Sequence, residues 1–199
     1  CQCAVGCARL LVPDQLTGAV PITFGSGITY GTITFANLDV AASRLARGLV
    51  AMGLRPGTRV ALLVPPGVEF VALVFALLRA GAVTIFVDPG MGRRNLIECL
   101  AAAEPEGFVG MSKAHAVRTL LRGKFPLAKY NVTVGRRWWW DGPTVGELGE
   151  LGDQSIELPD TTAEDSAAII FTSGSTGPPK GVLYTHGMFD TQVAEIQSR

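Results

Sequence analysis

Short apolar runs alternate with helix-like segments along most of this chain, and this alternation restricts the fold more than any other feature. Four runs have the length of strands that are buried on both faces: 59–64, 83–87, 107–110 and 132–134. Five segments have the apolar spacing of helices: 34–52 (with Thr34 as N-cap), 69–79, 95–103, 114–121 and a last one that begins at about 187. This order indicates βαβ units, so the sequence predicts an α/β fold with a mixed, largely parallel sheet and flanking helices.

One more apolar run, Ala167–Phe171, leads into a stretch of different character, Thr172-Ser173-Gly174-Ser175-Thr176-Gly177-Pro178-Pro179-Lys180-Gly181. Its glycines let consecutive backbone N–H groups converge on the oxygens of a phosphate. Four hydroxyl donors and one mobile cation suit the same ligand: Thr172, Ser173, Ser175, Thr176 and Lys180. The stretch therefore predicts a loop that binds the phosphates of a nucleotide.

A flexible glycine–serine linker has a similar composition. Two features favour a binding loop: a buried strand enters the stretch and a second expected strand, 181–184, leaves it, and Lys180 follows two prolines. The stretch is not a Walker A motif, because no Gly-Lys-Ser/Thr follows its first glycine at the required spacing. A hydrogen bond to a charged group contributes about 1.5–3 kcal/mol, so several together can hold a triphosphate.

The stretch resembles the phosphate loop of the adenylate-forming superfamily, which includes acyl-CoA synthetases, luciferases and the adenylation domains of peptide synthetases. The family pattern, Thr-Ser-Gly-Ser/Thr-Thr-Gly-x-Pro-Lys-Gly, is matched from Thr172 to Gly181. Enzymes of this family bind ATP with Mg²⁺, join a carboxylate to AMP and release pyrophosphate. The resemblance thus implies ATP and Mg²⁺ as the cofactors.

Only the loop can be carried over residue by residue. By resemblance, the phosphates of ATP are bound by Thr172, Ser173, Gly174, Ser175, Thr176, Gly177 and Lys180. Lys180 would also act catalytically by stabilising the charge that develops on the phosphates. The hydroxyl of Thr176 would lie near the Mg²⁺ ion that ATP brings.

Three further stretches resemble one branch of the superfamily, the β-lactone synthetases of bacterial olefin biosynthesis: 88–96, 131–138 and 186–192. That branch adenylates a 2-alkyl-3-hydroxy fatty acid, whose hydroxyl then closes onto the activated carbonyl to give a β-lactone with loss of AMP. The resemblance implies this reaction and a fatty acyl carboxylate as substrate. Two alternatives stay open: a long-chain fatty-acyl-CoA ligase, and a non-catalytic module that binds a nucleotide or a partner.

The resemblance runs from about Thr34 to Arg199, and residues 1–33 form a poorly defined N-terminal segment in which 28–33 is β-prone. The family's adenine and ribose motifs and its mobile C-terminal domain are not matched. We therefore expect 34–199 to be the first part of an AMP-binding N-terminal domain, and the chain to be a fragment that does not complete adenylation alone.

The 17 basic and 17 acidic residues give a formal net charge of zero, which argues against a nucleic-acid binder that relies on bulk electrostatics. The longest apolar run, 70–78, is too short to span a bilayer, and no secretion signal is evident. We expect a cytoplasmic protein with no transmembrane segment. A homo-oligomer and a complex with other enzymes of the pathway both stay open.

The remaining candidate residues favour structural roles. Cys1, Cys3 and Cys7 do not supply the four well-spaced ligands of a zinc site, so no metal site is expected there. Lys113 and His115 are expected to be a solvated lysine and a surface or capping histidine, and His186 a capping or packing residue. Cys99 is expected in the core.

Two stretches late in the chain complete the expectations. The run Arg136-Arg137-Trp138-Trp139-Trp140 has a composition found in surfaces that bind nucleic acids or membranes. With zero net charge and no second basic stripe, we favour a structural or subunit-contact role for it. Residues 148–164 are rich in glycine, proline and acidic residues and are expected to form a surface connection.

Overall fold

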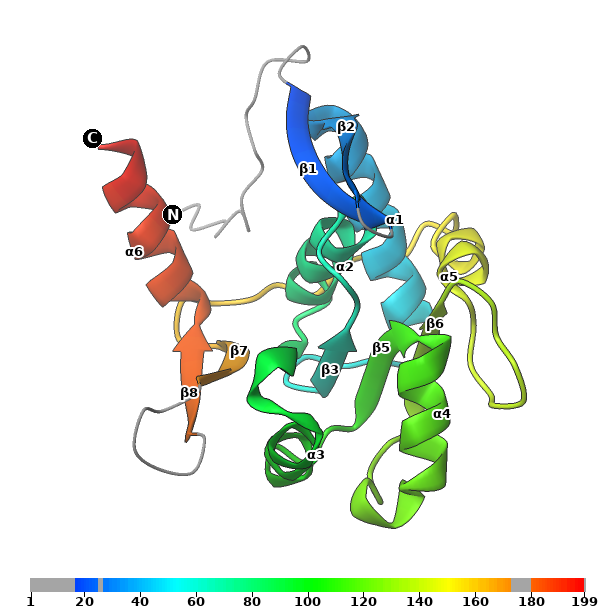
Figure 1. The fold of residues 1–199 in the computed structure, drawn as a ribbon. Coiled ribbons are helices and arrows are strands. Elements are labelled where there is room, and N and C mark those ends of the chain that lie inside the picture. Colours follow the sequence, from blue (N-terminus) through cyan, green and yellow to red (C-terminus); the bar gives the residue numbers. More distant parts are fainter. Residues whose placement is uncertain (1–16, 25–26, 173–179, 199) are drawn as a thin grey trace.

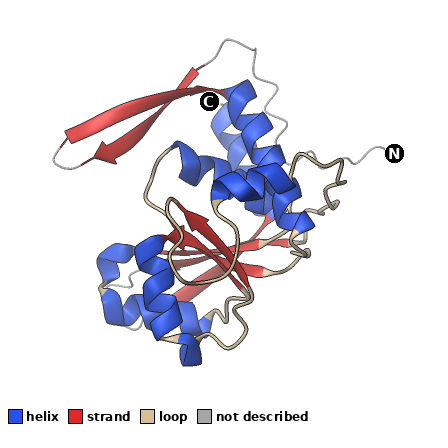
Figure 2. Cartoon of the chain, turned by 90° about the vertical axis from the view of Figure 1, so that its right-hand side faces the viewer, coloured by secondary structure: helices blue, strands red, loops and turns tan. Residues whose placement is uncertain are grey.

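The computed structural model describes residues 17–24, 27–172 and 180–198. The described residues form a six-stranded sheet with helices packed on both of its faces (Figure 1, Figure 2). Its strand order is β6-β5-β3-β4-β7-β8. The strands are β3 (Arg59–Leu63), β4 (Val83–Val87), β5 (Gly107–Met111), β6 (Tyr130–Val134), β7 (Ser166–Thr172) and β8 (Lys180–Thr185). Neighbours are parallel from β6 to β7, and β8 is antiparallel to β7, so the predicted mixed, largely parallel sheet is confirmed.

The helices are α1 (Phe35–Ala51), α2 (Val68–Arg79), α3 (Arg93–Ala102), α4 (Ser112–Leu120), α5 (Val145–Leu151) and α6 (His186–Gln197), with short 3₁₀ turns at Pro89–Met91 and Arg122–Lys124. The five predicted helices form close to their predicted bounds, as α1 to α4 and α6. Helix α1 begins as expected, because Thr34 Oγ1 accepts a hydrogen bond from the Asn37 N–H at 3.1 Å. It ends before Gly53, whose φ of 93° suits a residue without a side chain.

The core lies in two layers, one on each face of the sheet, as the alternation of side chains along a strand requires. On β3, Val60 and Leu62 pack in one layer with residues of α1 and α2. Ala61, between them, packs in the other layer, which contains Cys99 and Leu100 of α3. Cys99 is a free thiol and only 4% exposed, so its predicted place in the core is confirmed.

A β-hairpin precedes α1. Strand β1 (Thr17–Phe24) pairs antiparallel with β2 (Gly27–Thr34), from Thr17 opposite Thr34 to Phe24 opposite Gly27. The β-prone segment 28–33 lies within β2, whereas β1 was not predicted. The N-terminal cysteines lie outside the described residues, and the domain boundary at residue 34 stays a prediction.

The prediction of a surface connection over 148–164 is wrong at its start, where α5 forms. Leu148 of this helix is fully buried in the layer that contains α1. Thr144 and Glu147 form a capping box: Thr144 Oγ1 accepts from the Glu147 N–H at 3.3 Å, and the Glu147 carboxylate accepts from the Thr144 N–H at 2.7 Å. Thr-x-x-Glu is a helix-start signal that was readable in the sequence and was missed.

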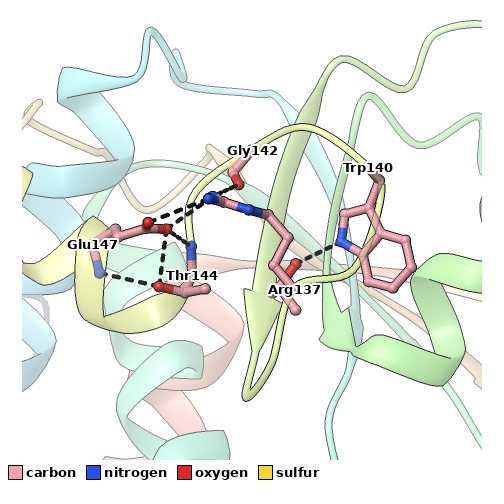
Figure 3. A network of polar contacts seen from close by, with 6 residues as sticks. Arg137, Trp140, Gly142, Thr144 and Glu147 are labelled. Atoms are coloured by element: carbon pink, nitrogen blue, oxygen red, sulfur yellow. Dashed lines mark hydrogen bonds and ion pairs between the residues drawn. The ribbon is translucent and has the colours of Figure 1, made fainter.

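The prediction that His115 lies at the surface is also wrong, because its side chain is 1% exposed. Its Nε2 lies 2.9 Å from the carbonyl oxygen of Val132 and donates to it, and its ring stacks on Trp140 with 5.5 Å between centroids. The Trp140 indole N–H donates to Thr133 Oγ1 at 2.8 Å (Figure 3). A structural role was predicted for the run 136–140, and it is confirmed for Trp140. This residue links the connection that follows β6 to α4, through His115, and to β6, through Thr133.

We predict that replacing Leu148 by alanine lowers the free energy of unfolding by about 2–5 kcal/mol, because it empties a fully buried site between α5 and α1. Leu151 of the same helix is 38% exposed, so Leu151→Ala is a matched control with an expected change of at most about 0.5 kcal/mol. Urea denaturation followed by circular dichroism measures both. Equal losses in the two variants would contradict the burial assigned to α5.

A second prediction concerns stability and pH. Burial lowers the pKa of both histidines below the ordinary value of 6.5, in His115 against the opposing effect of its hydrogen bond to Val132. From pH 6.5 down to the folded-state pKa, the unfolded chain therefore binds more protons than the folded one, so the free energy of unfolding falls as the pH falls through this window. His115→Gln keeps a donor for Val132 but cannot titrate. We expect a smaller pH slope in the variant, measured by urea denaturation between pH 7 and pH 5; an unchanged slope would contradict this account.

Candidate functional site at the carboxyl edge of the sheet

The predicted phosphate loop joins two strands at the carboxyl edge of the parallel sheet. Strand β7 runs parallel to β4, with Thr84 opposite Ala168 and Val87 opposite Phe171, so the chain leaves both strands at the same edge. Thr172 ends β7 and is paired with Lys180, which begins β8. Open α/β sheets bind their ligands outside the carboxyl ends of the strands. The loop therefore begins and ends where this architecture places a site.

The connections that leave β4 and β7 also run in opposite directions. From β4 the chain passes through α3 to β5, on the far side of β3, whereas from β7 it continues to β8 at the other side of the sheet. A divergence of this kind between neighbouring strands is a topological switch point, the usual position of a ligand in open α/β sheets. Topology and sequence thus indicate the same position.

The described residues include only the two ends of the predicted loop. Ser173, Gly174, Ser175, Thr176 and Gly177 lie outside them, so their contacts with phosphate and the Mg²⁺ role of Thr176 stay predictions. Lys180 is exposed and forms no ion pair with any described residue. An exposed cation at this edge fits a phosphate ligand.

The fit to ATP and Mg²⁺ follows from the types of donor in the loop. Hydroxyls, backbone N–H groups and one lysine are donors for phosphate oxygens. Among the described residues, no group of three or more His, Cys, Asp and Glu side chains can hold a metal ion. Mg²⁺ commonly binds through substrate phosphates with few protein ligands, so the loop would hold the ion chiefly through ATP.

A second loop at the same edge lies in the stretch 88–96, which the sequence marked by its resemblance to the β-lactone synthetases but not as part of the phosphate site. After β4, the Asp88 carboxylate accepts from the Gly90 N–H at 2.7 Å and closes a tight turn. Helix α3 then begins with Arg93 and Arg94, both exposed, with no acidic residue in its first turn. Cations at a helix N-terminus are unfavourable for the helix dipole. Arg94 pairs with Glu98 at 3.0 Å, whereas Arg93 forms no ion pair with any described residue and leaves a positive charge at this edge.

The amino edge of the sheet holds the other histidine and a half-open hollow. The hollow has a volume of about 480 Å³, and its walls include Arg59, Asp165 and Leu183. Asp165 has a lowered pKa, because its carboxylate accepts hydrogen bonds from the N–H and hydroxyl of Thr162. The backbone N–H of His186 donates to the Asp165 carbonyl at 3.0 Å. His186 therefore lies at the opposite end of β8 from Lys180.

The start of α6 decides between the two roles expected for His186, capping and packing. The N-cap of this helix is Thr185, whose Oγ1 accepts from the Met188 N–H at 3.4 Å, so a capping role for the histidine side chain is wrong. The ring is 4% exposed, which agrees with the packing role.

Comparisons with known proteins agree with this architecture. The chain is 44% identical over 191 residues to the olefin beta-lactone synthetase of Stenotrophomonas maltophilia (strain K279a), covering 94% of this chain and 34% of that protein. It is 42% identical over 204 residues to the olefin beta-lactone synthetase of Xanthomonas campestris pv. campestris, covering 100% of this chain and 36% of that protein. The chain thus spans about a third of the length of these curated relatives.

Solved structures share the fold. Apo MatB from Rhodopseudomonas palustris aligns with a TM-score of 0.66 and 28% identity over 83% of this chain and 32% of its own. A long-chain-fatty-acid-CoA ligase from Archaeoglobus fulgidus aligns with a TM-score of 0.66 and 24% identity, covering 82% and 32% of the two chains.

In the described part of the chain, no helix has the length and apolar character needed to cross a membrane. The family model described as AMP-binding enzyme matches residues 18–199. Since this family model matches nearly the whole chain, and since the sheet and the relatives agree with it, the chain belongs to the AMP-binding, adenylate-forming enzyme family.

Proposed function

We propose that this chain takes part in ATP-dependent adenylation of a fatty acyl carboxylate, a 2-alkyl-3-hydroxy acid, followed by closure to a β-lactone. The observation that carries the proposal is the 44% and 42% identity to two proteins named olefin beta-lactone synthetase, each matched over nearly the whole chain. A feruloyl-CoA synthase from an Amycolatopsis species is 33% identical over 78% of the chain.

The proposed reaction has two steps. In the first, a carboxylate oxygen attacks the α-phosphorus of ATP, an acyl–AMP anhydride forms and pyrophosphate leaves. In the second, the 3-hydroxyl oxygen attacks the acyl carbonyl, the C–O bond to AMP breaks, and the hydroxyl proton passes to a base. The product is a β-lactone and AMP, and CoA is not needed.

The predicted loop would serve the first step. Backbone N–H groups and hydroxyls between Thr172 and Lys180 would bind the β- and γ-phosphates and fix the α-phosphorus for attack. Lys180 would neutralise charge as pyrophosphate departs. Mg²⁺, bound mainly through the phosphates, would supply further charge neutralisation.

The alternative within the same family is a fatty-acyl-CoA ligase, which shares the first step. Relatives at about a third identity, such as the feruloyl-CoA synthase, keep this alternative open. The two differ in what attacks the acyl adenylate: the substrate's own hydroxyl or the thiol of CoA.

The test measures pyrophosphate release from ATP by the complete protein with a 2-alkyl-3-hydroxy fatty acid, with and without CoA. We expect release without CoA and a β-lactone by mass spectrometry. A thioester formed only with CoA would support the ligase. No release with any carboxylate would leave a nucleotide-binding or partner-binding module.

We predict that Lys180→Ala lowers the rate of pyrophosphate release about 10²–10³-fold, the usual cost of losing one transition-state charge contact. Lys129→Ala is the matched control, because Lys129 is also an exposed lysine but pairs with Glu106 at the amino edge. We expect the control to keep the wild-type rate. Equal activity in the Lys180 variant and the wild type would contradict the assignment of the loop.

A further inference from the structure

The register between β7 and β8 decides where Lys180 lies, because Lys180 begins β8 opposite Thr172. Strand β8 is the outermost strand of the sheet, and β7 is its one strand partner among the described residues (Figure 1). Residues 180–183 of β8 are all exposed. A strand has a strongly specified register where one of its faces is buried, and β8 lacks such a face over these residues. Its register therefore needs a further contact.

The ring of Phe171 occupies the place that a side chain at residue 181 would take. Phe171 and Gly181 are paired across β7 and β8, so their side-chain positions lie on the same face of the sheet. A Cβ atom added to Gly181 would lie 3.0 Å from Cζ and 3.1 Å from Cε1 of the Phe171 ring, and 3.1 Å from Cγ2 of Ile169. Carbon atoms in ordinary contact are about 3.5–4.0 Å apart. Glycine is therefore the residue that fits opposite Phe171 without a displacement.

The ring itself is held in the core. Phe171 is 8% exposed and lies in the layer that contains Ile85, Cys99 and Leu100. Its parallel partner on the other side of β7 is Val87 of β4. Close-packed interiors yield little, so a side chain at 181 would displace the exposed strand β8 rather than the ring.

The contact between Phe171 and Gly181 distinguishes this register from its neighbours. A shift of β8 by one residue would bring Lys180 or Val182 opposite the ring, and each has a side chain where the ring leaves no room. The same shift would turn the side chain of Lys180 to the other face of the sheet. Packing of an aromatic ring against a glycine of an edge strand is one of the devices that fix strand register.

We propose that Phe171 is a positioning residue: its ring, packed against Gly181, fixes the register of β8 and thereby the place of the Lys180 side chain. The part of the proposal that concerns Lys180 rests on the proposed function. The register contact itself involves only described residues of β7 and β8.

Gly181→Val tests the contact in the complete protein. Valine favours strands more than glycine does, so a loss is steric in origin. We expect the kcat of pyrophosphate release to fall about 10–10²-fold, the cost of displacing a catalytic group by about 1 Å. The KM for the fatty acid should not change, because the charge contact of Lys180 is made in the transition state.

Phe171→Leu provides the rescue. Leucine lacks the ring atoms Cζ and Cε1 that the new side chain would meet, and it can form an ordinary aliphatic pair with valine. The double variant Phe171→Leu, Gly181→Val should therefore regain most of the lost kcat. An equal loss from Gly181→Val with phenylalanine and with leucine at 171 would overturn the proposal.

Two further variants separate positioning from general damage. In a Lys180→Ala protein, Gly181→Val should cause no further fall in rate; a fall as large as in the wild type would overturn the claim that the contact acts through Lys180. Gly187→Ala is the matched control, because a Cβ there would also be crowded, at 3.0 Å from Ala163, but at the amino edge of the sheet. It should lower the thermal midpoint and keep the wild-type kcat. A loss of kcat equal to that in Gly181→Val would overturn the assignment.

Thermal unfolding makes the test independent of the reaction. We expect Gly181→Val to lower the Tm of the complete protein less when residue 171 is leucine, since residues in contact do not contribute additively. Additive shifts in Tm would overturn the register contact even where pyrophosphate is released. Non-additive shifts in a protein that releases no pyrophosphate would support the contact and overturn the proposed function, and with it the role of Lys180.

Discussion

The parallel pairing of β7 with β4 is the constraint on which the rest of the candidate site depends. Because Val87 lies opposite Phe171, both strands end at the same edge. The Asp88–Gly90 turn and the two ends of the predicted phosphate loop are thereby brought to one side of the sheet. The pairing is stabilised by residues buried on both faces, such as Ile85 and Ala168, so the position of the loop follows from the core.

The sequence predicted most of the fold, because buried parallel strands and amphipathic helices leave strong periodic signals. What it missed has physical reasons. His115 looked like a surface residue because one histidine in a polar-looking helix carries no signal of its partners, Val132 and Trp140, which come from distant elements. Strand β1 has apolar residues at every second position, Val20, Ile22 and Phe24, but Pro21 between them is unfavourable within a strand and hid the pattern. Helix α5 had a capping-box signal that was overlooked among glycines and acidic residues.

For the candidate site too, the sequence predicted one part and missed another. The loop motif and its flanking strands predicted a phosphate site at 172–181, and the sheet places the two described ends of this stretch, Thr172 and Lys180, at a switch point. The exposed pair Arg93 and Arg94 is at that edge because α3 follows β4; the sequence predicted this order of elements, but the arginines at the start of the helix were not considered for the site.

The central claim is that the carboxyl edge between β4 and β8 binds the triphosphate. Hydrogen–deuterium exchange with and without ATP and Mg²⁺ tests it most directly, because it reports on backbone N–H groups, the proposed phosphate donors. The account predicts slower exchange in peptides covering 172–181, with no change at the amino edge around Asp165 and His186. Slower exchange confined to the residues that line the amino-edge hollow, with 172–181 unchanged, would contradict it.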